Sequence, residues 1–129
     1  MKISRVDHFV LTVASVEATC EFYERVLGMK AVTFAGGRYA LECGASKINL
    51  HQAGAEFEPR ARMPGTGSGD FCLISEEPLE EVIRHLGKVG VPIEVGPVPK
   101  TGAAGAMTSV YIRDPDGNLV EISEYDDAG

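Results

Sequence analysis

The chain has 129 residues, of which 44% are hydrophobic, and its formal net charge is −7. This length and apolar content predict one folded domain with a real core and exclude a disordered chain. Lys and Arg form no run, which excludes the basic face that nucleic-acid binding needs. No apolar run approaches the roughly 20 residues of a membrane span. The N-terminus has no signal-peptide pattern, so we expect a cytoplasmic protein.

Three cysteines are spread along the chain without a C-x-x-C motif, at Cys20, Cys43 and Cys72. An odd, widely spaced set does not suit a disulfide framework. We interpret them as reduced core thiols of a cytoplasmic protein.

The first half of the chain reads as one strand, one helix and three further strands. Residues alternate in polarity from Arg5 to Val13, as in a half-buried strand. Ser15 is a suitable N-cap for a helix over about 16–27, and Gly28 stands where a C-cap glycine is expected. The pattern then predicts strands over about 30–34, 38–43 and 47–52.

A segment rich in Pro and Gly, 53–69, then separates this half from the next and is interpreted as a linker. After it the same order repeats, with a strand over 70–74 and an amphipathic helix from about 79 to 89 that Gly90 ends. The last expected elements are strands over about 93–95, 107–113 and 119–123. A Gly/Pro-rich loop over 96–106 is expected either to connect two strands or to close over a ligand.

The repeated order predicts an α+β fold of two tandem βαβββ modules within a single domain. Module 1 covers about 4–52, the linker about 53–69 and module 2 about 70–124. Internal repeats decide a fold, and they also make residues in the two halves equivalent.

Four residues at repeated positions are candidate metal ligands. His8 aligns with Asp70, and Gly28 aligns with Gly90 at the same spacing. With a longer spacing, His51 aligns with Glu121. All of these side-chain types bind metals.

Strand alternation puts His8, His51 and Glu121 on faces opposite their strongest apolar neighbours. Such a face either lines a site or is simply solvated, and the repeat favours a site. Asp70 has a second interpretation, because a carboxylate at the start of a strand often caps a turn.

The turn signal Asp114–Asn118 directly precedes the strand of Glu121. Asp-Gly adopts the positive φ of a tight turn easily, and the preceding proline fixes the entry. A one-residue slip of register would move Glu121 to the other face of the sheet.

Three motifs resemble the vicinal oxygen chelate superfamily, which includes glyoxalase I, fosfomycin-resistance thiol transferases, bleomycin-resistance proteins and extradiol dioxygenases. They are VDHFVLTV at 6–13, FY-x-x-VLG at 22–28 and RDPDGNLVE at 113–121. More narrowly, KINLH at 47–51, EFEP at 56–59 and the loop at 96–102 resemble a virulence-type subgroup labelled glyoxalase-domain-containing protein 5-like.

The resemblance implies a homodimer whose modules form cup-shaped mixed sheets with the helices outside. It implies one divalent ion, Zn²⁺, Ni²⁺, Mn²⁺ or Fe²⁺, held by His8, His51 and Glu121, with Asp70 as a possible fourth ligand. Glyoxalase I commonly has Glu where His51 stands and His or Gln where Asp70 stands. This difference argues against plain lactoylglutathione lyase activity.

Such an ion would act as a Lewis acid on a small substrate with two adjacent oxygens and stabilise the oxyanion that forms. Glu121 is the expected catalytic base, and glutathione is a possible cosubstrate. Substrate contacts are expected from Arg113, Lys47, Asn49 and Lys100. The alternatives are a non-haem iron dioxygenase and a metal-independent drug-binding protein of the bleomycin-resistance type.

Overall fold

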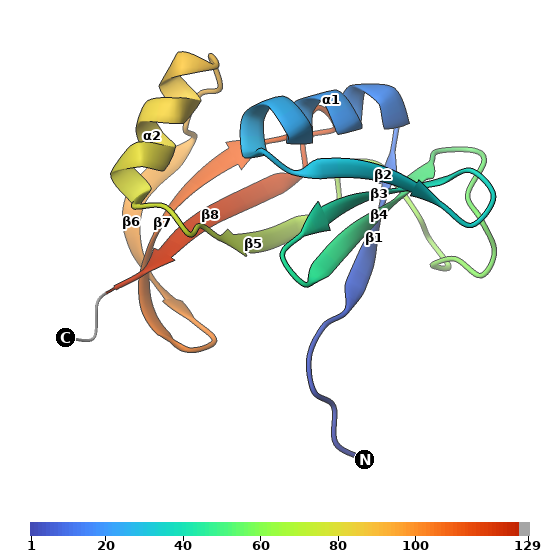
Figure 1. Ribbon diagram of the computed structural model, residues 1–129, viewed down its shortest axis with the longest axis horizontal. Helices are drawn as coiled ribbons and strands as arrows, with labels where there is room; N and C mark the ends of the chain where they lie inside the picture. Colours follow the sequence, from blue (N-terminus) through green and yellow to red (C-terminus); the bar gives the residue numbers. More distant parts are fainter. Residues whose placement is uncertain (127–129) are drawn as a thin grey trace. The chain divides into compact units, whose positions relative to one another are not determined.

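The computed structural model describes residues 1–126 and divides after Gly67 into two units, each with one helix and four strands. Each unit has a mixed four-stranded sheet (Figure 1). The predicted α+β class and the repeated βαβββ order are confirmed.

The first unit contains β1 (His8–Val13), α1 (Val16–Leu27), β2 (Lys30–Phe34), β3 (Arg38–Cys43) and β4 (Ser46–Gln52). Its sheet, here called the first sheet, has the strand order β1-β4-β3-β2. The β1–β4 pair is parallel and the other pairs are antiparallel. The chain must therefore cross from β1 through α1 and the β2–β3 hairpin before β4 can lie beside β1.

Helix α1 begins and ends where the sequence predicts. Ser15 Oγ accepts a hydrogen bond from the Ala18 N–H at 3.1 Å, which satisfies one of the free amides of the first turn. Gly28 ends the helix with φ 66°, a left-handed conformation that glycine adopts without strain.

The core of the first unit lies between α1 and one face of its sheet. The helix buries Phe22, Tyr23 and Val26, and α1 contacts β2, β3 and β4. The buried strand residues are Leu11, Val13, Leu41, Ile48 and Leu50. Because side chains alternate along a strand, this packing leaves His8, Asn49 and His51 on the opposite face.

The second unit contains β5 (Asp70–Ile74), α2 (Leu79–Lys88), β6 (Val95–Gly102), β7 (Gly105–Arg113) and β8 (Leu119–Tyr125). Its sheet, here called the second sheet, has the order β5-β8-β7-β6, and only the β5–β8 pair is parallel. The second unit therefore repeats the topology of the first.

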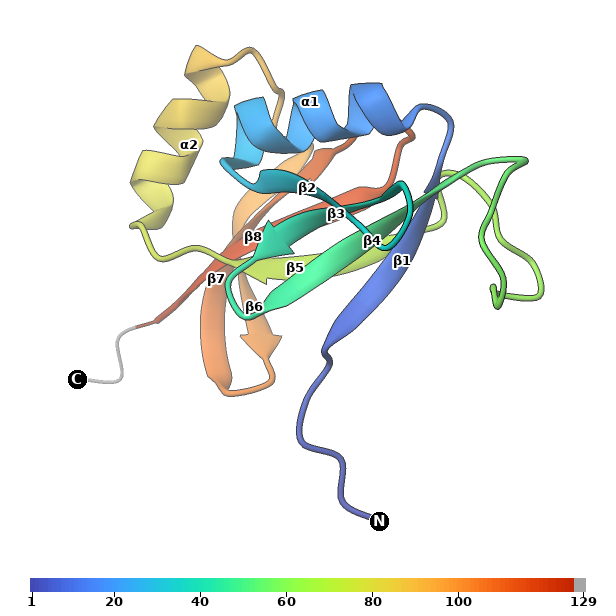
Figure 2. The same ribbon diagram turned by 45° about the vertical axis from the view of Figure 1, so that its right-hand side comes forward.

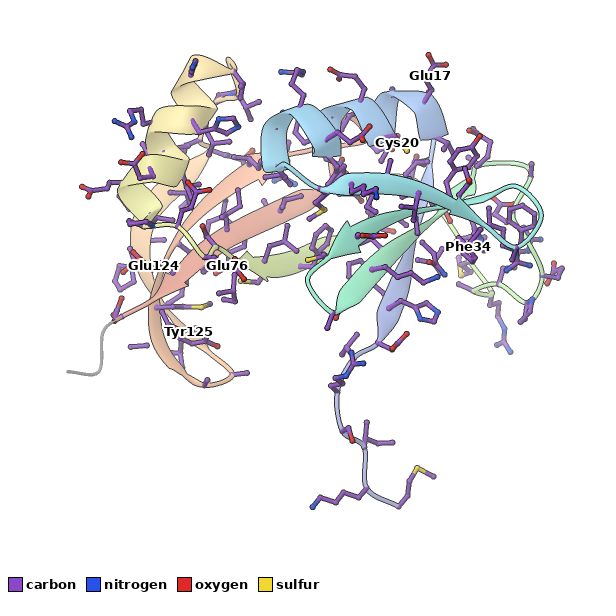
Figure 3. The ribbon with its side chains drawn as sticks, viewed as in Figure 1. Glu17, Cys20, Phe34, Glu76, Glu124 and Tyr125 are labelled. Atoms are coloured by element: carbon purple, nitrogen blue, oxygen red, sulfur yellow. The ribbon has the colours of Figure 1, made fainter. Side chains whose placement is uncertain are left out.

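Helix α2 is capped by a residue from its own sheet. The Leu79 N–H donates to Glu124 Oε1 at 3.1 Å, and Figure 3 shows Glu124 at the start of this helix. Leu79 and Leu86 are the buried helix residues. They belong to a core that includes Val110, Ile112, Val120 and Ile122.

The predicted loop 96–106 is wrong, because Val95–Gly102 is strand β6. Its Gly and Pro residues are tolerated because β6 is an edge strand that needs hydrogen bonds on one side only. At Gly96 a glycine is required, since φ is +109° and a Cβ there would lie 2.4 Å from the Ser109 carbonyl oxygen.

The predicted linker is largely an ordered part of the first unit, as Figure 2 shows for the green segment that follows β4. Glu56 Oε2 accepts from the Gly54 N–H at 2.9 Å, and Glu56 Oε1 accepts from Arg60 at 2.8 Å. Arg60 also pairs with Glu58 at 3.1 Å. These contacts fold the segment into a defined loop.

In the described part of the chain, no helix is long and apolar enough to cross a membrane.

Candidate metal centre and binding face

The polar face of the second sheet gathers chemically active side chains around Glu121. The strand register pairs Glu121 with Cys72 on one side and with Tyr111 on the other. Asp70 lies two positions before Cys72 on the same strand and therefore on the same face. The predicted location of Glu121 on the face opposite the helix core is thus confirmed, and Asp70 lies on the same face.

A chain of hydrogen bonds holds the carboxylate of Glu121. Ser123 Oγ donates to Glu121 Oε2 at 3.3 Å, and the Ser109 and Ser123 hydroxyl oxygens are 2.6 Å apart. Both serines are fully buried. Since Ser123 has one proton and gives it to Glu121, Ser109 is the donor in the second bond. The thiol of Cys72 lies 3.2 Å from Ser123 Oγ.

The groups beside Glu121 stay neutral. Burial raises the pKa of the Tyr111 phenol, and the negative charge and hydrogen bond of Glu121 raise it further. Burial likewise raises the pKa of the Cys72 thiol. The protonated phenol and the Ser123 hydroxyl are therefore the donors beside the carboxylate, and Ser109 supports Ser123 from behind.

In the first sheet, a carboxylate orients His8. Its Nδ1 lies 2.8 Å from Asp7 Oδ2, and this hydrogen bond is the main cause that lowers the pKa of Asp7. An Asp7 carboxylate accepts the Nδ1 proton, which leaves Nε2 as the free ligand atom. Carboxylate–histidine pairs of this kind commonly fix metal-binding imidazoles.

The structure does not bring the two predicted histidine ligands together. His8 pairs with Lys47 across β1 and β4, whereas His51 pairs with Thr12, four positions further along. Four residues of a strand span about 13 Å, too far for two imidazoles on one sheet face to bind the same ion. Among residues 1–126, no group of three or more His, Cys, Asp or Glu side chains is arranged closely enough to hold a metal ion.

The register also corrects the alignment of the repeats. The first residue of β1, His8, pairs with Lys47, and the first residue of β5, Asp70, pairs with Leu119. Asn49 lies two positions after Lys47 in the first unit, and Glu121 lies two positions after Leu119 in the second. Asn49, rather than His51, is therefore the structural counterpart of Glu121.

Asn49 has an atom available for a ligand. Its side-chain Oδ1 is buried and has no hydrogen-bond partner among the described residues. An unpaired buried carbonyl oxygen is unfavourable unless something binds it. An amide oxygen is a suitable ligand for a hard divalent cation, so this position fits a metal.

The predicted substrate-binding cations are differently engaged. Arg113 donates to Glu94 through Nε at 3.1 Å and Nη2 at 2.9 Å, and to the Gly117 carbonyl at 3.1 Å. The bond to Gly117 lies in the β7–β8 turn, whereas the bonds to Glu94 tie the end of β7 to the residue before β6. Lys100 Nζ lies 5.7 Å from the centre of the Tyr111 ring.

Lys47 Nζ lies 3.7 Å from the centre of the Phe34 ring. His51 is buried and meets the ring of Phe57 edge-on at 5.8 Å. The sequence did not point to Phe57 as a site residue, and Arg38 stacks on its ring. The position of Phe57 depends on the fold of the linker, for which residue alternation gives no signal.

Comparison with known proteins agrees with this architecture. A family described as the Glyoxalase/Bleomycin resistance protein/Dioxygenase superfamily matches residues 5–122. Virulence protein STM3117 from Salmonella typhimurium is 54% identical over 125 residues, which are 97% of this chain and 87% of that protein. Its crystal structure has a TM-score of 0.96 at 53% identity, with coverage of 98% of this chain and 100% of that one.

Two further relatives carry glyoxalase names. Glyoxalase domain-containing protein RDO1 from Mycosarcoma maydis is 46% identical over 128 residues, which are 99% of this chain and 72% of that protein. Lactoylglutathione lyase from Escherichia coli O157:H7 is 28% identical over 139 residues, with coverage of 97% and 96%. By its family match, its close relatives and its repeated fold, the chain belongs to the glyoxalase/bleomycin resistance protein/dioxygenase superfamily.

Proposed function

We propose that the protein is a metal-dependent, glyoxalase-like enzyme that acts on a small metabolite with two adjacent oxygens. One observation carries this proposal. Each unit presents a pair of possible ligands at equivalent register positions, His8 with Asn49 and Asp70 with Glu121. Two positions along a strand span about 7 Å, so each pair is close enough to share an ion.

The proposed ligand set combines one imidazole nitrogen with amide and carboxylate oxygens. Such mixed ligands suit Mn²⁺, Fe²⁺, Ni²⁺ or Zn²⁺. When bound, the ion would supply Lewis-acid polarisation of the substrate oxygens.

His51, which sequence reasoning included among the ligands, is left out of this set. Its register position lies too far along β4 from His8. It is the counterpart of Ser123 rather than of Glu121.

In this proposal Glu121 moves the proton. Its carboxylate accepts the C–H proton from the hydroxyl-bearing carbon of an α-hydroxy carbonyl substrate and returns it to the former carbonyl carbon. The hydroxyl proton passes to the former carbonyl oxygen, so the substrate is isomerised with no atom gained or lost. Ser123 holds Oε2 at 3.3 Å, so the carboxylate has a fixed direction. The neutral Tyr111 phenol beside it can donate to a developing oxyanion.

The similarity to lactoylglutathione lyase supports the glyoxalase type of chemistry. It makes glutathione a cosubstrate worth testing. Free thiols at all three cysteines accord with a reducing, cytoplasmic location.

The test begins with chelator-treated protein that is reloaded separately with Mn²⁺, Fe²⁺, Ni²⁺ and Zn²⁺. Turnover of methylglyoxal is then measured with and without glutathione, alongside a panel of hydroxy-ketones and dicarbonyl compounds. We expect metal-dependent isomerisation that falls by a factor of about 10² or more in Glu121→Gln, as for loss of a general base. Glu80→Gln, on the surface of α2, is the matched control.

Two results would contradict the proposal. Oxygen consumption on catechols with Fe²⁺ would favour a dioxygenase. Failure of every ion to bind the wild-type protein would favour a metal-independent binding protein.

A further inference from the structure

Two cations on the polar face of the first sheet form no ion pair with any described residue, although Glu42 is the register partner of Lys47 across β3 and β4. Within the described residues, Arg38 and Lys47 form no ion pair with a carboxylate, and each contacts an aromatic ring instead. In a chain with a net charge of −7, acidic partners are abundant. Unpaired cations on one side of a sheet therefore indicate a place where an anion binds.

Arg38 is held in a geometry that suits anion recognition. Its guanidinium carbon lies 4.4 Å from the centre of the Phe57 ring. A stacked guanidinium uses its flat face for the ring and leaves its N–H edges free for a bidentate oxyanion. His51 meets the same ring edge-on, with an interplanar angle of 70°, so Phe57 positions two potential donors.

Lys47 reaches the same end of the sheet. Its Nζ lies 3.7 Å from the Phe34 ring, and Phe34 is the register partner of Arg38 across β2 and β3. The lysine side chain therefore crosses the sheet from β4 toward β2. Figure 3 shows Phe34 at the end of the first sheet beside the segment that follows β4.

The loop that carries Phe57 is fixed by charges of its own. Glu56 accepts from the Gly54 N–H and from Arg60. The bond from Gly54 is the main cause that lowers the pKa of Glu56, with backbone and Arg60 contacts adding to it. Phe57 is thus held next to Arg38 and His51 before any ligand arrives, which favours tight binding.

We propose that Arg38, Lys47 and His51 form an anion-binding subsite for a carboxylate or phosphate group of the substrate, with Phe57 as its positioning residue. As a substrate subsite it rests on the proposed enzymatic function. His51 lies four strand positions, about 13 Å, from the level of His8. The anionic group would therefore be at the end of the substrate remote from the chelating oxygens.

The test uses metal-free protein, so that its outcome is independent of the metal proposal. Inorganic phosphate and acetate are titrated separately into ¹⁵N-labelled protein at constant ionic strength, and amide shifts are followed by NMR. We expect saturable shifts at residues 38, 47, 51 and 57. The probe with the lower Kd, phosphate or acetate, identifies whether the subsite prefers a phosphate or a carboxylate group.

Three variants separate a built subsite from general charge attraction. Arg38→Gln should raise the Kd of the stronger probe about tenfold, because hydrogen bonds between charged groups are the strong ones. Phe57→Leu should weaken binding severalfold at unchanged net charge. Arg25→Gln, which removes one cation of an exposed ion pair on α1, should leave the Kd unchanged.

An equal rise in Kd for Arg38→Gln and Arg25→Gln would overturn the subsite. Amide shifts that do not saturate, or that lie away from residues 38, 47, 51 and 57, would overturn it as well. Loss of metal binding in the enzyme assays, with anion binding intact, would overturn the enzymatic function alone. If Phe57→Leu unfolds the linker, its NMR spectrum will show this directly. Arg38→Lys, which keeps the charge but loses the planar fork, then replaces it and should also weaken binding.

Discussion

At the scale of single residues, Asp7 is the neighbour that would orient His8 in the proposed metal centre. It lies one residue away in sequence, and its carboxylate contacts His8 Nδ1 at 2.8 Å. Without it, the imidazole is free to rotate and to exchange tautomers.

Asp7→Asn should therefore lower the affinity for the preferred divalent ion about tenfold, the usual effect of losing an outer-sphere carboxylate. Competition with a chromophoric chelator measures this affinity. Glu21→Gln, on the exposed face of α1, is the control and should bind as the wild type does. Equal affinities of Asp7→Asn and wild type would exclude the orienting role.

The three thiols provide a prediction about pH. Burial is the main cause that raises the pKa of Cys20, Cys43 and Cys72 above the ordinary value of 9.0. A raised pKa means less thiolate at any given pH, and only the thiolate is alkylated. In the folded protein, alkylation of each cysteine should therefore speed up at higher pH than in the urea-unfolded chain.

Pulse alkylation with iodoacetamide, resolved by mass spectrometry for each cysteine, measures the alkylation rate against pH in the folded and the unfolded protein. Because the thiol pKa values are raised in the folded state, the folded protein keeps thiol protons at a pH where the unfolded chain has already lost them. The contribution of the raised pKa values to stability is thus complete below pH 9 and is lost as the pH rises through the folded-state values. A cysteine that reacts as fast when folded as when unfolded would contradict the raised pKa of its thiol. Cys72 is exposed, so the prediction of a core thiol is wrong at that position.

At the scale of elements, strand β6 depends on one close backbone approach. A Cβ at Gly96 would lie 2.4 Å from the Ser109 carbonyl oxygen, whereas a Cβ at Gly105 would meet nothing within 4 Å. Both glycines have positive φ, +109° and +140°. An alanine at Gly105 would therefore suffer backbone strain alone, whereas an alanine at Gly96 would suffer the same kind of strain and a steric clash.

We expect Gly105→Ala to lower the free energy of unfolding by about 1 kcal/mol through strain alone. Gly96→Ala should lower it by at least about 2 kcal/mol more, since overpacking adds to the strain. Urea denaturation of both variants measures the difference. Equal stability of the two would mean that β6 can move away from β7 without loss.

The β7–β8 turn shows how much local sequence can determine. Asp114 Oδ1 accepts from the backbone N–H groups of Asp116 and Asn118, both at 2.9 Å. Asn118 Oδ1 in turn accepts from the Gly69 N–H at 2.7 Å, just before β5. The turn signal in the sequence was correct because these contacts are mostly local. They set the register that places Glu121 on the polar face.

Local patterns likewise predicted α1 with its cap at Ser15 and most of the strands. They failed for β6, because Gly and Pro usually mark loops and the edge position of this strand was not visible. They also failed for the alignment of β4 with β8. The β1–β4 pairing joins segments about 40 residues apart in the sequence. Residue alternation predicts which face of the sheet a side chain is on, but a strand displaced by two residues along its partner keeps the same alternation, so the register stays open.

At the scale of the whole molecule, two units with the same topology carry different chemistry on their polar faces. The first offers His8 and Asn49 with a cationic cluster further along the sheet. The second offers Asp70 and Glu121 with neutral donors. Repetition supplies equivalent positions, and the residues at those positions set the ligand type.

The most direct test of the proposed metal centre is the metal content of four proteins, measured by mass spectrometry after loading and removal of free ions. We predict about one divalent ion per chain in the wild type and in His51→Ala, and strongly reduced content in Asn49→Ala and Glu121→Ala. Metal loss in His51→Ala with retention in Asn49→Ala would contradict the ligand set derived from the strand register. Wild-type protein that retains no ion under any loading condition would contradict the metal centre itself.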